Sequence, residues 1–211
     1  MIDTCLFDLD GTLINTNDLI IASFLHTLNH YYPGRYTKKD VIAFIGEPLE
    51  VSFQRVDPAR VKELCEHYRR YNLEKHDELV KEFPNVNDTL KTLKEKGYKL
   101  GIVTTKRRET VNLGIRLTKI EPFFDVIVTI DDVKRPKPAP DPVRLALEKL
   151  GSKPEQAVMI GDSPFDIEAG RSAGTKTVGV SWTIKGVAAL REVHPDYLID
   201  DMKELLAIVD A

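Results

Sequence analysis

The stretch "TCLFDLDGTLINT", residues 4–16, leads an apolar strand directly into two aspartates, Asp8 and Asp10. Alternate residues of a β-strand share a face, so the two carboxylates are expected to point the same way while Phe7 and Leu9 enter a core. Two like charges this close repel each other near the low-dielectric end of a buried strand. The stretch therefore predicts a compensating group beside it: a cation, a shared proton, or both.

The length and charge of the chain exclude several classes of protein. Its 211 residues can bury one sizeable core with a smaller insertion, and its formal net charge of −3 lacks the basic excess that is typical of nucleic-acid binders. The longest apolar run, "LIIASFL", is too short to span a bilayer, and no secretory signal is recognisable. Cys5 and Cys65 form no metal-binding pattern and are expected to be buried thiols. We expect a cytoplasmic protein without nucleic-acid or membrane partners.

The order of helical and strand patterns predicts the fold. A helical pattern fills residues 17–80, and regular alternation of strand and helix follows Pro84. Such alternation is typical of parallel strands joined by right-handed crossovers. We predict an α/β fold, with a Rossmann-like open parallel sheet in residues 1–14 and 82–211 and a helical domain, residues 15–81, inserted after the first strand. The strands are predicted at residues 2–9, 98–104, 126–130, 157–161, 175–180 and 197–199.

Local signals divide the inserted segment into four helices. The fourth is predicted to begin with Asp57 as its N-cap and Pro58 in its first turn. This helix carries the charge run "HYRRYNLEKHDE", residues 67–78, which we interpret as a solvated helix face.

Polar residues gather where four of the predicted strands reach their carboxyl ends. Ligands of open parallel sheets bind at this edge. The polar residues are Asp8 and Asp10, Thr104, Lys137, and Asp162 with Asp166 four residues later.

Each of these signals alone has an ordinary interpretation. Asp10 with the following glycine can be only a turn, and Thr104 only a strand former. Lys137 can be a solvated loop residue, and Asp162 can cap the helix that follows it. A calcium loop is excluded, because the required glycine and glutamate positions are not filled. The conjunction of all of them at one sheet edge favours a site.

These residue types suit phosphoryl transfer onto a carboxylate. Asp8 and Asp162 are predicted to hold Mg²⁺, which prefers a few carboxylates together with phosphate oxygens. Asp8 is the expected nucleophile, and Asp10 the group that gives a proton to the leaving group and later takes one from water. Thr104 is expected to hydrogen-bond a phosphoryl oxygen, and Lys137 to balance the negative charge.

Four motifs, "DLDGT", "VTT", "KPAP" and "GDSPFD", resemble in this order those of the haloacid dehalogenase superfamily. The resemblance implies the same residue roles and identifies the helical insertion with a C1-type cap. It adds the Asp10 carbonyl as a further metal ligand and Asp166 as a residue that holds a metal-bound water or orients Lys137. Asp10 indicates a phosphatase or phosphomutase, because dehalogenases lack this second aspartate and phosphonatases and ion-pumping ATPases carry alanine or threonine there.

Longer strings at residues 7–37, 44–49, 102–106 and 182–186 resemble a bacterial pyrophosphatase branch of that superfamily. This resemblance implies inorganic pyrophosphate as the substrate, including the pyrophosphate released when the serine-phosphorylated phosphocarrier protein is dephosphorylated. It also implies a functional link to the kinase/phosphorylase of that phosphocarrier protein. Phosphoglycolate phosphatase, a sugar phosphomutase and a non-catalytic binding protein of the same fold remain alternatives.

Pyrophosphate carries more charge than a phosphomonoester, so its site needs additional cations. Thr105 and Lys106 follow Thr104 and are predicted to bind phosphate with it, while Lys106 and the two arginines after it begin the next helix. Gly46, between two inserted helices, is expected to lie in the cap loop that meets the substrate. The insertion is expected to move as a lid, with hinges near Asn15 and Phe83.

Overall fold

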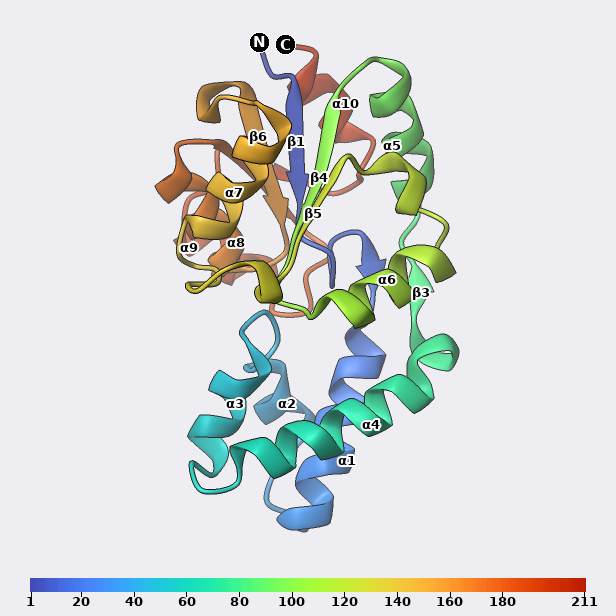
Figure 1. The fold of residues 1–211 in the computed structure, drawn as a ribbon, viewed down its shortest axis with the longest axis vertical. Helices are drawn as coiled ribbons and strands as arrows, with labels where there is room; N and C mark the ends of the chain where they lie inside the picture. The colour runs from blue at the N-terminus through green and yellow to red at the C-terminus, as the bar shows by residue number, and fades with distance from the viewer.

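The computed structural model describes residues 1–211 and contains a six-stranded sheet in the order β5-β4-β1-β6-β7-β8 (Figure 1). Every neighbouring pair is parallel, which confirms the predicted α/β fold. The strands are β1 (Thr4–Phe7), β4 (Lys99–Val103), β5 (Val126–Val128), β6 (Ala157–Gly161), β7 (Lys176–Val180) and β8 (Tyr197–Ile199). The first strand is shorter than predicted, although the Asp8 amide still donates to the Ile160 carbonyl at 2.8 Å.

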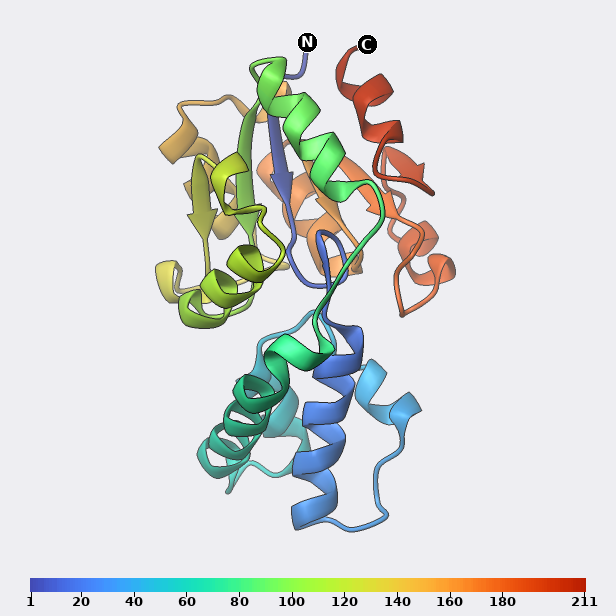
Figure 2. The same cartoon turned by 90° about the vertical axis from the view of Figure 1, so that its right-hand side faces the viewer.

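Helices cover both faces of the sheet, so successive side chains of β1 enter two different cores (Figures 1 and 2). Cys5 and Phe7 pack in the core beneath α5 (Val86–Glu95), α6 (Arg108–Leu117) and α10 (Glu204–Val209). Leu6 packs on the other face, beneath α7 (Asp141–Leu150) and α8 (Pro164–Ala173). Burial of both faces explains why this strand reads as a continuous apolar run.

The remaining core elements are short. They are α9 (Val187–Glu192) and the 3₁₀ helices η1 (Glu121–Phe123), η2 (Ile130–Asp132) and η3 (Pro154–Gln156). Neither α9 nor the 3₁₀ helices were expected from the sequence. No helix of the chain is both long enough and apolar enough to cross a membrane.

The four inserted helices lie together beyond the carboxyl ends of the strands (Figure 1). They are α1 (Asn17–Tyr31), α2 (Lys38–Ile42), α3 (Leu49–Val56) and α4 (Val61–Leu79). They surround an apolar cluster of their own that includes Phe24, Phe53 and Leu64. An antiparallel pair of two-residue strands, β2 (Ile14–Asn15) and β3 (Lys81–Glu82), joins them to the sheet, as the extended segments in Figure 2 show.

The start of α4 was predicted wrongly. Asp57 lies at the C-terminal end of α3, and α4 begins only at Val61. The Asp57 carboxylate accepts hydrogen bonds from the Tyr32 hydroxyl at 2.6 Å and from the Ala59 amide at 3.0 Å. The aspartate therefore stabilises a turn between two helices. Aspartate is favoured both in such turns and at helix N-caps, so the sequence pattern alone does not distinguish the two.

Candidate active site

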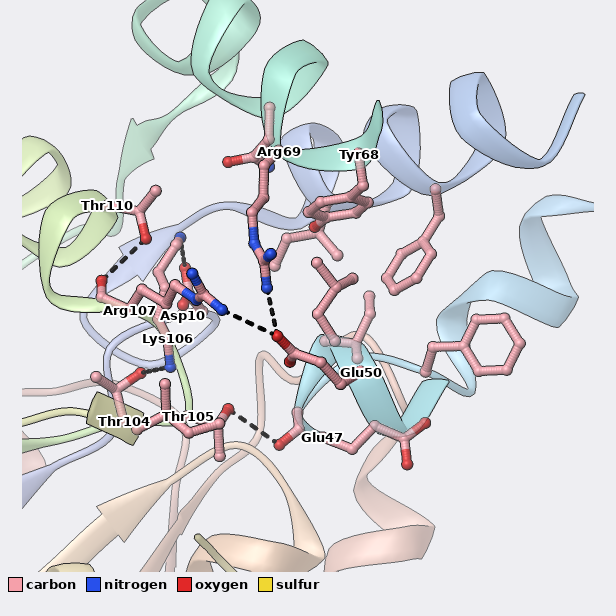
Figure 3. Close-up of a pocket in the computed structure, with 18 of the residues that line it drawn as sticks. Asp10, Glu47, Glu50, Tyr68, Arg69, Thr104, Thr105, Lys106, Arg107 and Thr110 are labelled. Atoms are coloured by element: carbon pink, nitrogen blue, oxygen red, sulfur yellow. Dashed lines mark hydrogen bonds and ion pairs between the residues drawn. The ribbon is translucent and has the colours of Figure 1, made fainter. Parts of the chain in front are cut away.

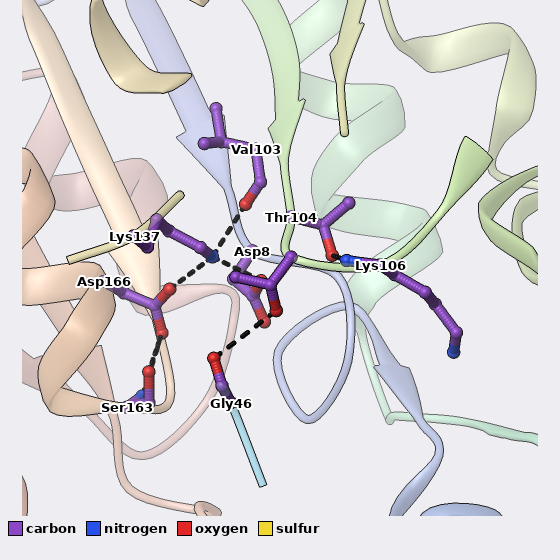
Figure 4. A network of polar contacts seen from close by, with 9 residues as sticks. Asp8, Gly46, Val103, Thr104, Lys106, Lys137, Ser163 and Asp166 are labelled. Carbon is purple, nitrogen blue, oxygen red and sulfur yellow. Dashed lines mark hydrogen bonds and ion pairs between the residues drawn. The ribbon is translucent and has the colours of Figure 1, made fainter. Parts of the chain in front are cut away.

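The strand order brings the predicted site residues together. The central strand β1 lies between β4 and β6, so Asp8, Thr104 and Asp162 follow three adjacent strands. The long loop after β5 returns Lys137 to the same edge, where it lies beside Asp8 (Figure 4).

Lys137 forms the centre of a buried polar network (Figure 4). Its Nζ donates to Asp8 Oδ1 at 2.6 Å, to Asp166 Oδ1 at 2.5 Å and to the Val103 carbonyl at 2.8 Å. Only 3% of the residue is exposed, so the alternative of a solvated loop lysine is wrong. All three protons of the ammonium group have acceptors, which fixes its position beside Asp8.

Carboxylates outnumber cations at this point. Asp8, Asp162 and Asp166 are buried, and one potential ligand atom from each lies within 4.8 Å of the others. Burial raises the pKa of Asp8 to about 7 although Lys137 lowers it, and burial together with the Asp8 charge raises the pKa of Asp162 well above its usual range. Burial opposes the charged form of Lys137, but the carboxylates of Asp166 and Asp8 raise its pKa. The site therefore has the donors and the charge deficit that suit a divalent cation.

A glycine permits the close approach of these carboxylates. Gly11 has φ +81°, and a Cβ there would lie 2.5 Å from Asp162 Oδ2. Any other residue would be strained by the left-handed backbone and would also displace the Asp162 carboxylate. The Asp10-Gly11 pair is therefore a turn, and the same turn holds Asp10 at the sheet edge and leaves room there for the Asp162 carboxylate.

Asp166 joins the network to the helix that follows β6. Its Oδ2 accepts from the Ser163 amide at 3.0 Å and from the Ser163 hydroxyl at 2.7 Å, while Oδ1 accepts from Lys137. Ser163 is the N-cap of α8, so the alternative of Asp162 as the cap is wrong. Of the two roles expected for Asp166, the observed contact is the one that orients Lys137.

The carboxylate of Asp10 lies outside the acidic triad, although it lines the same pocket as Asp8. Its Oδ1 accepts from Lys106 Nζ at 2.6 Å and from the Thr16 hydroxyl at 2.7 Å. Lys106, predicted to bind phosphate, is thus paired with Asp10. It also precedes α6, which begins at Arg108, so the expectation that it lies in the first helical turn is wrong.

Thr104, Thr105 and Gly46 lie where the insertion contacts the sheet edge. Thr104 is buried, and its Oγ1 accepts from the Lys106 amide at 3.2 Å. The Thr105 hydroxyl donates to the Gly46 carbonyl at 3.4 Å. Gly46 has φ +95°, and a Cβ there would contact Ser163 of the core.

A cavity of about 170 Å³ lies between the insertion and the sheet edge (Figure 3). Asp8 and Asp10 are both in its lining. Thr104, Thr105, Lys106 and Gly46 also line it. Apolar side chains form much of the wall that the insertion contributes: Ile20, Phe24, Phe44, Ile45, Leu49 and Leu73. The polar residues of that wall include Glu47, Glu50, Arg69 and Asn72.

Sequence reasoning missed these polar residues of the insertion. The charge run at residues 67–78 was interpreted as a solvated face, but His67, Tyr68, Asn72 and His76 are buried and Arg69 lines the cavity. One signal could have found Asn72, because the apolar stripe that contains Tyr68 reaches it four residues later. Lys185 of the core was missed as well: burial lowers its pKa, while the nearby charges of Asp162 and Asp166 oppose this shift, so it lies within reach of the acidic cluster.

Comparisons with known proteins agree with this geometry. Residues 5–180 match the family model described as haloacid dehalogenase-like hydrolase. A pyrophosphatase PpaX of Anoxybacillus flavithermus is 58% identical over 208 residues, covering 99% of this chain and 97% of the relative. A pyrophosphatase PpaX of Bacillus pumilus is 57% identical over 210 residues, covering 100% of this chain and 97% of the relative.

Solved structures share the fold. A hydrolase described as a haloacid dehalogenase-like family protein from Streptococcus pneumoniae has a TM-score of 0.87 at 31% identity, covering 98% of both chains. A predicted phosphoglycolate phosphatase from Haemophilus somnus has a TM-score of 0.85 at 28% identity, covering 98% of this chain and 97% of the other. The family model and the near-full-length relatives show that this chain belongs to the haloacid dehalogenase-like hydrolases.

Proposed function

We propose that this hydrolase is an inorganic pyrophosphatase that transfers a phosphoryl group to Asp8 and then to water. The observation that carries the phosphoryl-transfer chemistry is the buried carboxylate of Asp8, held by Lys137 at the wall of a small cavity. Support for the substrate comes from the relatives named pyrophosphatase PpaX and from the cations Arg69, Lys106 and Arg107 that line this cavity.

The first step forms a bond between Asp8 and phosphorus. Lys137 occupies Oδ1 of Asp8, which leaves the other oxygen of that carboxylate for in-line attack. The bond between phosphorus and the bridging oxygen breaks, and the departing phosphate takes a proton from Asp10. Lys106 and Thr16 hold Asp10 in place for this transfer.

The second step releases the phosphoryl group from Asp8. Asp10 removes a proton from water, the resulting hydroxide forms a bond to phosphorus, and the bond to Asp8 breaks. The second phosphate leaves and the Asp8 carboxylate is restored. Thr104 and Thr105 are proposed to bind phosphoryl oxygens in both steps, because they follow β4 beside Asp8.

The donor set fits Mg²⁺. Asp8, Asp162 and the Asp10 carbonyl are proposed to hold it, and Asp166 to act through Lys137. When bound, the ion supplies positive charge to the phosphoryl oxygens. This charge also offsets the repulsion between the buried carboxylates, the problem posed by residues 4–16.

The insertion is proposed to act as a lid that excludes bulk water during transfer. It already contacts the core through Gly46, whose carbonyl accepts from Thr105. Water would otherwise compete for the phosphoryl oxygens and weaken every charge interaction in the site.

The deciding test compares kcat/KM for pyrophosphate and phosphoglycolate at one Mg²⁺ concentration. We expect pyrophosphate to be preferred and Asp8→Asn to be inactive on both. Preference for phosphoglycolate would overturn the substrate while leaving the mechanism, and turnover in excess chelator would overturn the role of the metal. In a parallel assay on a sugar phosphate, isomerised product without free phosphate would indicate a mutase.

The link to the phosphocarrier protein is a separate proposal. Removal of pyrophosphate should drive phosphorolysis of the serine-phosphorylated protein forward, because it removes a product. We expect the native enzyme, added to that protein with its phosphorylase and phosphate, to increase the dephosphorylated fraction at equilibrium. The Asp8→Asn variant is the control; an equal increase with this variant would contradict the link.

A further inference from the structure

We propose that Arg69 of the insertion and Arg107 of the core bind the phosphoryl group of pyrophosphate that leaves, and that Glu50 occupies this subsite when substrate is absent. This inference rests on the proposed pyrophosphatase function. Arg69 and Arg107 would bind the phosphate that leaves, whereas the network around Asp8 would bind the phosphoryl group that is transferred.

The three residues meet at one oxygen atom (Figure 3). Glu50 Oε1 accepts from Arg69 Nη2 at 2.5 Å and from Arg107 Nη2 at 3.2 Å. Glu50 lies in the first turn of α3, Arg69 in α4, and Arg107 is the N-cap of α6. The contact therefore joins two helices of the insertion to the sheet domain.

All three side chains line the cavity that contains Asp8 and Asp10. Arg69 is the only cationic side chain that the insertion contributes to this lining, and 29% of its side chain is exposed. Most of the side chains around it are apolar, and the Asn72 amide of the same wall already donates to the Ser23 hydroxyl at 3.0 Å. A second phosphoryl group that extends from Asp8 toward the insertion would therefore meet Arg69.

The charge of this cluster is unbalanced. Partial burial favours the neutral form of Glu50, but hydrogen bonds and the charges of Arg69 and Arg107 lower its pKa, so it is a carboxylate. One carboxylate against two guanidinium groups leaves a net positive charge. A phosphate carries more charge and more acceptor oxygens than a carboxylate, so it can satisfy both guanidinium forks at once.

The other cations of the site already have close partners. Lys137 donates to Asp8 and Asp166, and Lys106 donates to Asp10. By contrast, Arg69 and Arg107 share one partially exposed carboxylate, which can rotate away without leaving a buried charge. The two arginines are thus the groups that an incoming anion can recruit at least cost.

The test uses one substrate with a second phosphoryl group, pyrophosphate, and one without, p-nitrophenyl phosphate. We expect Arg69→Ala to raise KM for pyrophosphate about tenfold or more, because a charge-assisted contact is lost, and to change kcat/KM for p-nitrophenyl phosphate about threefold at most. Arg107→Ala should show the same selectivity. Arg70→Ala is the matched control, since Arg70 is the neighbouring exposed arginine of α4 and does not line the cavity.

Two further variants, Arg69→Lys and Glu50→Gln, test the role of charge in the subsite. Arg69→Lys retains charge and should recover part of the loss on pyrophosphate, which would not follow from a purely structural role. Glu50→Gln should lower KM for pyrophosphate, because the competing charge is removed; a raised KM would overturn the role of Glu50 as the resident anion. Thermal unfolding of each variant with Mg²⁺ verifies that it is folded.

Pyrophosphate hydrolysis by the native enzyme distinguishes a failure of the subsite from a failure of the proposed function. If the native enzyme does not hydrolyse pyrophosphate, the proposed function fails and the subsite fails with it. If it hydrolyses pyrophosphate but Arg69→Ala loses the same factor on both substrates, only the subsite is overturned.

Discussion

Lys106 Nζ lies 2.6 Å from Asp10 Oδ1, so the lysine predicted to bind phosphate is held by the aspartate predicted to move protons. The contact gives Lys106 a second role, which is to position Asp10. If Lys106 positions Asp10, its loss should affect every substrate; if it binds phosphate directly, its loss should affect pyrophosphate most.

For Lys106→Ala, we expect kcat to fall about tenfold or more on both pyrophosphate and p-nitrophenyl phosphate, because Asp10 is less well positioned in each reaction. Steady-state kinetics on the two substrates measure this. Arg108→Ala is the control, since Arg108 is paired with Asp132 and does not line the cavity. A loss confined to KM for pyrophosphate would instead indicate a direct phosphate contact.

Asp8→Asn and Lys137→Met should separate catalysis from stability. We expect Asp8→Asn to reduce kcat by a factor on the order of 10⁴ or more without lowering the metal-free unfolding free energy, because it removes a surplus buried charge. Lys137→Met should abolish activity and also cost about 3–5 kcal/mol, because Asp8 and Asp166 lose their shared cation. Urea unfolding and turnover assays test both; an equally unstable Asp8→Asn variant would contradict the charge argument.

Mg²⁺ affinity should increase with pH through about 7. Burial raises the pKa of Asp8 to about 7, so at lower pH a proton competes with the metal for this carboxylate. Each pH unit below that value should weaken binding by at most about tenfold per proton released. Titration calorimetry in two buffers of different ionisation enthalpy measures affinity and proton release together. Affinity that is constant from pH 6 to pH 8 would refute this expectation.

Gly11→Ala should impair the site more than its backbone strain alone explains. Its φ of +81° and the approach of Asp162 Oδ2 both oppose a Cβ, whereas Gly34 has φ +71° with nothing within 4 Å. We expect Gly34→Ala to cost about 1 kcal/mol and to leave kcat unchanged. Gly11→Ala should cost more and also weaken Mg²⁺ binding. Similar effects of the two variants would show that the contact with Asp162 is unimportant.

The insertion should lose stability as pH falls below about 6.5. His67 is buried, with the rings of His26 and His30 stacked on it at centroid distances of 5.1 and 4.7 Å. Burial and then the charges of His30 and His26 lower its pKa, so in acid the unfolded chain binds this proton more readily than the folded chain does. The contribution of neutral His67 to the free energy of unfolding is complete above the pKa of histidine in the unfolded chain. Below that pKa it is lost, by at most about 1.4 kcal/mol per pH unit.

Urea unfolding at pH 7.5 and pH 5.5 compares the native protein with His67→Gln. The variant should show the smaller loss of stability in acid, because it lacks the buried titrating group. His194→Asn replaces an exposed histidine and should behave as the native protein does. An unchanged pH dependence in His67→Gln would exclude His67 as the cause.

The sheet and the residues at its edge were predictable for one physical reason. Parallel strands end at a common edge, so polar residues directly after strands converge there whatever the details of packing. This placed Asp8, Thr104 and Asp162 together from the sequence. The β2–β3 pair was not predictable, because two-residue strands are too short for an alternation pattern to be visible.

The insertion side of the site could not be predicted from local patterns. Which face of α4 meets the core depends on how the insertion packs against the sheet, and local sequence does not encode that orientation. Arg69 therefore resembles the exposed Arg70 beside it, although the structure places only Arg69 in the cavity. The Lys106–Asp10 contact was missed for a different reason: both residues follow adjacent strands, but Lys106 lies in an irregular bend, where no alternation pattern fixes the direction of its side chain.

The pairing of Ile14 with Glu82 and of Asn15 with Lys81 has a mechanical consequence for the proposed lid. Because the two connections are paired with each other, we expect sliding and twisting of the insertion to be restrained and rotation about one axis to be its main motion. The loop between α2 and α3, which contains Gly46, meets the sheet edge on a different side of the insertion from these connections (Figure 1). A small rotation at the connections would therefore displace the Gly46 loop by more than the connections themselves, and in the proposed lid a single angle would set the width of the entrance.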